Sequence, residues 1–112
     1  MLEDLCLIIP SYNRPQYIAR TVRYLIKINY PGDVCICDSS LEPWKGDVPA
    51  NIEYMNVPGM SFPDKVLAVI LEKTHKLFML CPDDDFVVLP SVCIGYTFMM
   101  NEPRFSCYSG EY

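Results

Sequence analysis

The chain alternates between short apolar runs and longer stretches in which apolar residues recur every three or four positions. Unbroken apolar runs, such as LCLII at residues 5–9, are typical of strands that are covered on both faces of a sheet. A spacing of three or four residues is typical of helices with one buried face. The pattern predicts strands over residues 5–9, 33–40, 51–57 and 76–81, and helices over residues 16–29, 61–75 and 91–101.

The first predicted helix has the clearest two-sided pattern. One face is formed by Ile18, Val22, Leu25, Ile26 and Asn29. Another face carries the basic residues Arg20, Arg23 and Lys27. Pro31 and Gly32 are expected to follow its end. The second helix is expected to begin at Ser61 as the cap, with Asp64 in the first turn.

The order of the elements predicts the fold class. Strand–helix–strand–strand–helix–strand–helix is typical of an α/β fold, in which a mostly parallel sheet is flanked by helices and joined by right-handed crossovers. We expect the 112 residues to form a single domain, because this length is close to the usual domain size. Residues 104–112 are expected to form a last strand that is cut short.

The net charge of −5 bears on the choice of partners. Nucleic acids and anionic membranes are unfavourable as general partners, because both require a basic surface. A phosphate-bearing ligand would need a few local bases or a metal ion. No stretch approaches the roughly 20 apolar residues of a membrane span. Glu3 and Asp4 stand where a signal peptide needs basic residues, so we predict a soluble protein without a transmembrane segment.

The cysteines do not suggest a metal site. The chain has six cysteines without a C-x-x-C spacing and a single histidine, which leaves a zinc site few ligands. Cys35 and Cys37 are two residues apart on a predicted strand and therefore share a face. We interpret the cysteines as small buried side chains of a protein in a reducing, cytoplasmic compartment.

Polar residues end or follow three of the predicted strands. These segments are PSYNR at residues 10–14, DSS at residues 38–40 and DDD at residues 83–85. In open α/β sheets ligands bind beyond the carboxyl ends of the strands, so we expect the three segments to meet in one site. The chain has neither G-x-G-x-x-G nor G-x-x-x-x-G-K-S/T, which argues against a Rossmann dehydrogenase and a P-loop protein.

Three consecutive aspartates after a buried strand suit a hard divalent cation. Carboxylate oxygens are preferred ligands of Mg²⁺ and Mn²⁺, and a bound ion removes the repulsion between neighbouring negative charges. A solvated acidic loop, or an aspartate that caps the following helix, explains the same residues without a ligand. The position after a buried strand, with Asp38 and Tyr12 expected nearby, favours a site.

Three segments together resemble the nucleotide-sugar-binding half of family-2 glycosyltransferases, which have the GT-A fold. The segments are LIIPSYNRPQYIARTVRYL, VCICDSS and FMLCPDDDFVVLP. In order, they match a P-[ST]-Y-N motif after the first strand, an aspartate followed by small polar residues, and a D-x-D motif. Pro90, seven residues beyond Asp83, also matches. The resemblance covers about residues 5–103.

The resemblance implies a site for a nucleotide diphosphate-sugar, in particular a UDP-sugar. Tyr12 would lie against the base, and Pro10 and Ser11 belong to the motif that lines the base pocket. Asp38 would accept a hydrogen bond from a uracil-type N–H. A tyrosine packed on its own loop and a turn-forming aspartate are the structural alternatives for Tyr12 and Asp38.

The three aspartates Asp83–Asp85, called the acidic turn below, would hold the ribose and the metal. By resemblance, Asp83 contacts the ribose, and Asp85 binds the divalent ion, Mn²⁺ or Mg²⁺, that bridges the diphosphate, with Asp83 as a second metal candidate. Asp84 has the variable middle position, where it faces the donor or points away. Arg14 either meets a phosphate or caps a surface loop. Lys65 stands where the family often has a base that reaches the nucleotide, although a solvated helix lysine is the simpler interpretation.

The chain departs from the family in two places. Phe86 stands where many members have a further acid after D-x-D. The general base of the family, an aspartate of the acceptor-binding half, and the remaining strands fall beyond residue 112. An inverting transfer needs that base to deprotonate the acceptor. The resemblance therefore implies a truncated, donor-binding portion with no assigned catalytic residue and an unknown acceptor.

Other functions stay open. The same fold could serve as a non-catalytic nucleotide- or cation-binding module. A nucleotidyltransferase fits less well, because that class begins with a Gly-rich loop after the first strand and PSYNRP has no glycine. If the sheet normally continues, its edge is exposed here, and we expect self-association through that edge.

Overall fold

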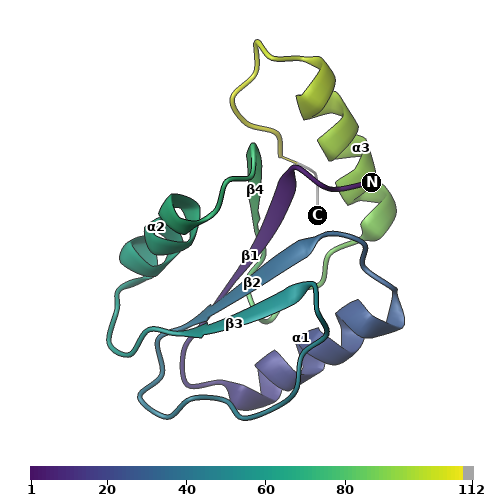
Figure 1. Ribbon diagram of the computed structural model, residues 1–112. Helices are drawn as coiled ribbons and strands as arrows, with labels where there is room; N and C mark the ends of the chain where they lie inside the picture. Colours follow the sequence, from purple (N-terminus) through teal and green to yellow (C-terminus); the bar gives the residue numbers. More distant parts are fainter. Residues whose placement is uncertain (110–112) are drawn as a thin grey trace.

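The computed structural model describes residues 1–109 and contains one parallel sheet with helices on both faces (Figure 1). The strands are β1 (Leu5–Ser11), β2 (Asp33–Asp38), β3 (Ile52–Asn56) and β4 (Leu77–Leu80). The helices are α1 (Pro15–Lys27), α2 (Phe62–Glu72) and α3 (Leu89–Asn101). The predicted α/β fold with a parallel sheet flanked by helices is therefore confirmed.

The strand order β3-β2-β1-β4 places the ends of three strands at one level. Ser11 of β1 lies opposite Asp38 of β2, and Asp38 lies opposite Asn56 of β3. The chain then crosses to the other side of β1 to form β4, so the strand order reverses between β1 and β4. Ligands of open α/β sheets bind at such a reversal, beyond the carboxyl ends of the strands.

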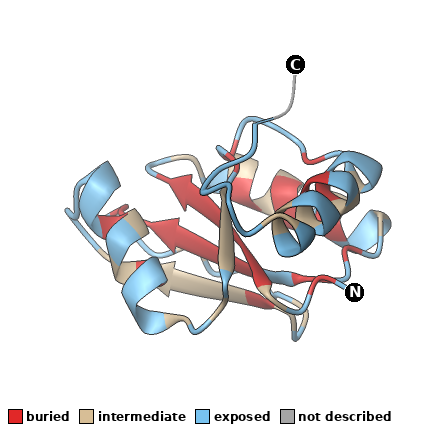
Figure 2. Cartoon of the chain, turned by 90° about the horizontal axis from the view of Figure 1, so that it is seen from above, coloured by how far each residue is buried: buried red, intermediate tan, exposed pale blue. Residues whose placement is uncertain are grey.

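The two faces of the sheet are covered by different helices (Figure 1). On one face, Leu7 and Ile9 of β1 pack with Val22 of α1 and Val92 of α3. On the other face, a smaller apolar cluster is formed by Cys6, Ile8, Cys35, Cys37 and Val69 of α2. Figure 2 shows the central strands β1 and β2 largely buried, the outer strands β3 and β4 mostly at intermediate burial, and the outer sides of the helices exposed. Within residues 1–109, no helix is both long and apolar enough to cross a membrane.

Four of the six cysteines are buried, as the sequence predicts. Cys93 is only partly buried and Cys107 is exposed, so the interpretation is wrong for Cys107. Cys35 and Cys37 share the face that α2 covers, as expected. Burial raises the pKa of the Cys37 thiol to about 11. This thiol therefore stays protonated and acts as a small apolar side chain.

The first helix ends at Lys27, two residues earlier than predicted. Asn29 has φ 51°, and the following N–H, of Tyr30, donates to the Leu25 carbonyl over 3.0 Å. A residue in this left-handed conformation ends a helix, because it turns the chain out of the helical path. Ile26 is exposed and does not belong to the buried face, which corrects the predicted pattern.

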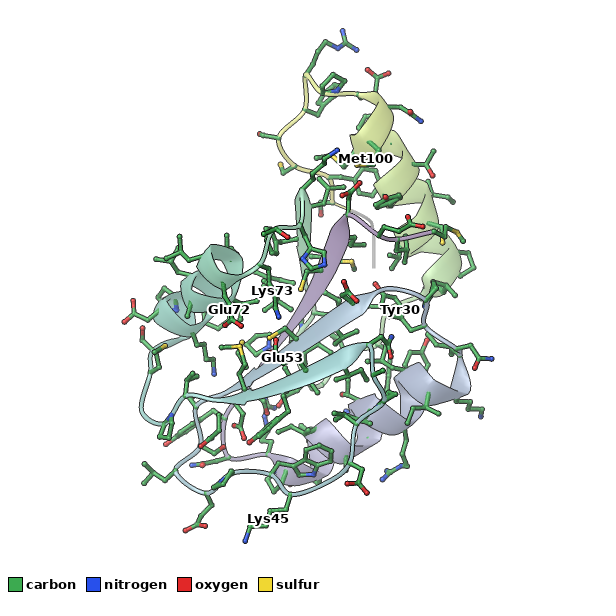
Figure 3. All side chains as sticks on the ribbon, in the orientation of Figure 1. Tyr30, Lys45, Glu53, Glu72, Lys73 and Met100 are labelled. Carbon is green, nitrogen blue, oxygen red and sulfur yellow. The ribbon has the colours of Figure 1, made fainter. Side chains whose placement is uncertain are left out.

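The second helix begins as predicted. The Ser61 hydroxyl accepts from the Asp64 N–H over 3.3 Å. The helix ends at Glu72 rather than near His75, because the backbone of Lys73 is extended with ψ 154°. Lys73 then pairs with Glu53 of β3, and Figure 3 shows the two side chains between α2 and the sheet. This ion pair fixes the end of α2 to the sheet.

The tail does not form the expected last strand within residues 104–109, and the rest of that segment lies outside the described residues. Phe105 and Tyr108 instead pack on Phe98 of α3, with ring centroids 5.3 and 5.7 Å apart. A Cβ on Gly95 would lie 2.9 Å from the Tyr108 ring, so the glycine permits this close approach. Apolar contact with α3 therefore holds the tail away from the sheet edge.

Candidate functional site

The three polar segments that follow the strands meet at the carboxyl edge of the sheet. The Ser11 hydroxyl, at the end of β1, donates to Asp83 Oδ2 over 2.6 Å. The Ser39 N–H, after β2, donates to the Ser11 carbonyl over 3.1 Å. The predicted convergence is therefore present in the structure, with Ser11 between the other two segments.

Asp38 ties the neighbouring loops together from a buried position. Asp38 is only 1% exposed. Asp38 Oδ1 accepts from the Ser40 N–H over 3.1 Å and from the Ser40 hydroxyl over 2.6 Å, while Oδ2 accepts from the Tyr54 hydroxyl over 2.6 Å. The Asn13 N–H in turn donates to the Ser40 hydroxyl over 2.7 Å. This is the turn-forming arrangement that the sequence left open for Asp38.

Two residues of β3 complete this network, and sequence reasoning missed both. The Tyr54 hydroxyl accepts from the Trp44 N–H over 2.8 Å, and the Asn56 side chain donates to the Asp38 carbonyl over 3.2 Å. Burial, with the hydrogen bond to Asp38 as the next cause, raises the pKa of Tyr54 to about 12. The available signal was the alternation along β3, which puts Tyr54 and Asn56 on one face.

Asp83 is also fully buried, with an exposed fraction of 0%, but its partners differ. Its Oδ2 accepts from Ser11, while Oδ1 lies 2.7 Å from Arg14 Nη2. The Arg14 N–H is not aligned with Oδ1, so this contact is an ion pair and Oδ1 has no hydrogen-bond donor. Arg14 Nη1 lies 3.9 Å from Asp84 Oδ2. The Arg14 guanidinium therefore pairs with two neighbouring carboxylates, those of Asp83 and Asp84.

A series of cations and aromatic rings joins the acidic turn to α1. The Arg14 and Arg20 guanidinium groups lie 5.0 and 4.7 Å from the centroid of the Tyr17 ring. Arg20 also lies 5.0 Å from the centroid of Phe86, whose ring is 4.7 Å from that of Tyr24. Such contacts stabilise by about 0.5–1 kcal/mol each at partly exposed sites. Phe86 thus attaches the acidic turn to α1.

The acidic turn only partly fits a divalent ion. Asp84 and Asp85 are exposed carboxylates, which an ion can reach. Asp83 does not fit as an ion ligand in this arrangement, because Ser11 and Arg14 occupy its two oxygens. Within residues 1–109, no group of three or more His, Cys, Asp or Glu side chains is arranged to hold a metal.

Cys81, two residues before Asp83, lies in the negative field of the three aspartates. Burial raises the pKa of its thiol to about 11, and the charges of Asp85, Asp84 and Asp83 add to the effect. A thiolate is therefore unfavourable here, and Cys81 is not suited to be a nucleophile.

Lys65 is the largest departure from the sequence interpretation, which favoured a solvated helix lysine. It is only 5% exposed, and its Nζ donates to the Ser11 carbonyl over 2.7 Å and to the Ser39 hydroxyl over 3.0 Å. The first turn of α2 lies over the ends of β1 and β2, which brings the ammonium there. Neither partner carries a charge. Since an ammonium has three donors, one remains for a ligand.

An open pocket of about 410 Å³ lies beside this ammonium. Its lining residues are Tyr12, Ser39, Gly59, Met60, Phe62 and Lys65. Tyr12 and Phe62 are 57% and 56% exposed, so two aromatic rings are available for contact. Gly59 has φ 73°, a conformation that glycine adopts without strain, and it turns the chain from β3 into α2. The pocket suits a flat ring that carries hydrogen-bond acceptors.

A second pocket, of about 260 Å³, lies between α1 and the start of β3. Its lining residues are Leu25, Ile26, Asn29, Tyr30, Pro49, Asn51 and Ile52. None of these residues is Asp, Glu, His, Lys or Arg, and the pocket lies toward the amino ends of the strands. It offers no complement to a charged ligand.

The structure separates the residues predicted for the site into layers. Pro10, Ser11, Asp38 and Asp83 are buried beneath the surface. Tyr12 and Lys65 line the larger pocket, and Arg14 lies between the acidic turn and solvent. Asp84 and Asp85 are exposed, and Asp84 lies within 3.9 Å of the Arg14 guanidinium. Met60 and Phe62 also line the larger pocket, and they were not predicted as site residues. The available signal was their position beside the Ser61 cap: the turn from the end of β3 into α2 lies at the carboxyl edge of the sheet.

The chain matches no model of a known protein family, no curated protein and no solved structure.

Proposed function

We propose that the chain binds a nucleotide diphosphate-sugar, in particular a UDP-sugar, and serves as the donor-binding portion of a glycosyltransferase. The observation that supports this most strongly is the buried ammonium of Lys65. It lines the larger pocket, has a donor left over, and has no countercharge among its hydrogen-bond partners. A buried cation without a countercharge is unfavourable unless a ligand supplies acceptors or negative charge.

The rest of the pocket supports a nucleotide as that ligand. The exposed rings of Tyr12 and Phe62 offer flat apolar surfaces for a base. Ser39 accepts from Lys65, so its own hydroxyl hydrogen remains to donate. The pocket therefore presents donors from two side chains, and its ligand has to present acceptors. Pyrimidine carbonyl groups, ribose oxygens and phosphate oxygens meet that requirement.

The cations at the strand ends support a phosphate-bearing ligand in a chain of net charge −5. Arg14 and Lys65 are both at the carboxyl edge of the sheet, where the local bases that a phosphate needs were expected. A divalent ion on Asp85 remains part of the proposal. When bound, such an ion would neutralise charge on the leaving diphosphate.

A non-catalytic nucleotide-binding module is the second candidate. The observation that favours it is the pairing of Asp83 with Ser11 and Arg14, which keeps this carboxylate from a reacting group. No side chain of the site is assigned as a general base. Transfer of the sugar from a UDP-sugar, measured with candidate acceptors, separates this module from a glycosyltransferase.

Calorimetric titration of UDP tests the proposal. We expect Lys65→Met to weaken UDP binding at least about tenfold, which corresponds to about 1.4 kcal/mol. Lys27→Met is the matched control, because Lys27 is an exposed lysine in the last turn of α1, at the opposite end of the strands. Repeating the titration with Mn²⁺ and with excess chelator shows whether an ion contributes. Absence of UDP binding by the wild-type chain, or equal binding by Lys65→Met, would contradict the proposal.

A further inference from the structure

We infer that the outer side of α1 docks an acidic peptide segment of a partner protein. Arg20, Arg23 and Lys27 share one side of this helix and are called the basic face below. Figures 1 and 2 show α1 covering one face of the sheet, with its outer side exposed. The basic face shares no residue with the nucleotide pocket, so the inference goes beyond the proposed function.

The basic face has no acidic partner within residues 1–109. Helix α1 contains neither Asp nor Glu, and no ion pair of the described chain involves Arg20, Arg23 or Lys27. Most of the other cations do have a carboxylate within 4.0 Å, namely Arg14, Lys73, Lys76 and Arg104. Like charges three or four residues apart on a helix repel each other. A partner that carries carboxylates would therefore offset a positive charge that this acidic chain leaves unpaired.

Arg20 is held in place before any partner binds. Its guanidinium lies 4.7 Å from the centroid of the Tyr17 ring and 5.0 Å from that of Phe86. Its Nε is buried and has no hydrogen-bond partner among the described residues. A planar guanidinium can bind a carboxylate through two parallel hydrogen bonds in its own plane. Because the two rings already restrict this side chain, binding through it costs less side-chain entropy.

The helix dipole does not account for the basic face. Lys27 is in the last turn of α1, where a cation is favourable beside the carboxyl end of the helix. Arg20 and Arg23 precede that turn, and the effect of the dipole falls off within one turn. Two of the three cations are therefore left without a role inside the described chain.

The size of the basic face favours a short acidic peptide over a larger polyanion. From Arg20 to Lys27 the helix rises by about 10 Å, a length that about three residues of extended peptide cover. A nucleic acid or an anionic membrane would extend over the rest of the surface, where the net charge of −5 is unfavourable to it. A peptide with two or three neighbouring carboxylates can contact the basic face alone.

Fluorescence anisotropy of a dye-labelled hexaglutamate peptide at low ionic strength tests the docking. We expect the wild-type chain to bind hexaglutamate and not hexaglutamine. The double variant Arg20→Gln, Arg23→Gln should bind hexaglutamate at least about tenfold more weakly, because two carboxylate partners are lost. The matched control is Lys45→Gln, Arg104→Gln, which removes the same charge from an exposed loop and from the tail. Its affinity should stay within about threefold of the wild type.

Four results would overturn the inference: no binding of hexaglutamate by the wild type, no loss in Arg20→Gln, Arg23→Gln, an equal loss in the control, or stronger binding of single-stranded RNA or phosphatidylserine vesicles. If the first double variant does not fold, as followed by circular dichroism, Arg23→Gln, Lys27→Gln takes its place, because it keeps the ring contacts of Arg20. The same loss is expected there, and wild-type affinity would overturn the inference. Titration with UDP tests the proposed function separately, since the two surfaces share no residue.

Discussion

Asp38 and Asp83 are both carboxylates buried at the carboxyl edge of the same sheet, yet they are held in different ways. Asp38 receives three hydrogen bonds from neutral groups of Ser40 and Tyr54. Asp83 receives one hydrogen bond from Ser11 and otherwise faces a half-exposed guanidinium. Asp38 is satisfied by groups of neighbouring strands and loops, and Asp83 depends on a half-exposed arginine side chain.

Their positions in the sheet explain this difference. Asp38 ends β2, which has a paired strand on each side, so neighbouring loops can converge on it. Asp83 follows β4, a four-residue strand that is paired with β1 alone. A carboxylate surrounded by strand ends can be satisfied by neighbouring strands and loops, while one beside an edge strand relies on a cation from a half-exposed side chain.

The largest expected effect is the loss of the Asp38 carboxylate. We expect Asp38→Ala to lower the free energy of unfolding by about 3 kcal/mol, because it leaves buried donors of Ser40 and Tyr54 without an acceptor. Urea denaturation measures this. The control Asp47→Ala, in an exposed loop, should stay within about 0.5 kcal/mol of the wild type. An equally small change in the free energy of unfolding for Asp38→Ala would show that the Asp38 carboxylate does not stabilise these loops.

Tyr54→Phe should lower the free energy of unfolding by less than Asp38→Ala, and its effect should depend on pH. At neutral pH we expect a loss of about 1.5 kcal/mol, the usual value for a hydrogen bond to a charged group. Because the pKa of Tyr54 is raised from 10.0 to about 12 in the folded chain, the unfolded chain releases this proton first. The stability advantage of the wild type over Tyr54→Phe should therefore shrink as the pH rises from about 10 to about 12. Urea denaturation of both proteins across that range checks the sign, and a constant advantage would contradict it.

The corresponding change at the edge strand should be milder. We expect Asp83→Ala to lower the free energy of unfolding by about 1 kcal/mol, because the half-exposed Arg14 can be solvated by water when its partner is lost. The difference from Asp38→Ala is the sharpest test of the comparison. High salt should reduce the Asp83 effect and leave the Asp38 effect unchanged, since only the former involves a half-exposed ion pair. Equal losses at the two positions would show that both carboxylates are structural.

The smallest expected effect concerns the free edge of β4. We propose that the chain self-associates weakly there, because β4 is an edge strand and Leu80 is 51% exposed. Leu80→Lys should then reduce the apparent mass at high concentration, as measured by light scattering, and Lys76→Gln, at an exposed residue next to the same strand, should not. A monodisperse wild-type monomer would contradict this proposal.

Much of the fold could be predicted from the pattern of apolar residues. Runs such as LCLII indicate strands that are covered on both faces, and the polar residues after them mark the edge where the site lies. These are local signals, and they survive in the structure because burial follows the same periodicity that the sequence shows. The predicted last strand is wrong for residues 104–109, because the aromatic residues of this segment pack on α3 instead of pairing at the sheet edge.

The partners of the charged groups could not be predicted in the same way. Whether Lys65 is solvated or buried depends on where the first turn of α2 lies relative to the ends of β1 and β2, which is set by the crossover. Whether Asp83 faces an ion or Arg14 depends on contacts between residues that are far apart in the chain. Spacing along the sequence identifies such residues, but only the packing of the helices decides which charges meet.

The most direct test of the proposed site is a titration of ¹⁵N-labelled protein with UDP, followed by the amide signals in two-dimensional NMR spectra. If the nucleotide binds beside Lys65, the amide signals of Tyr12, Ser39 and Gly59 should shift, and those of Tyr30 and Asn51 at the second pocket should not. Shifts confined to the second pocket, or no shifts at all, would show that the carboxyl edge of the sheet is not a nucleotide site.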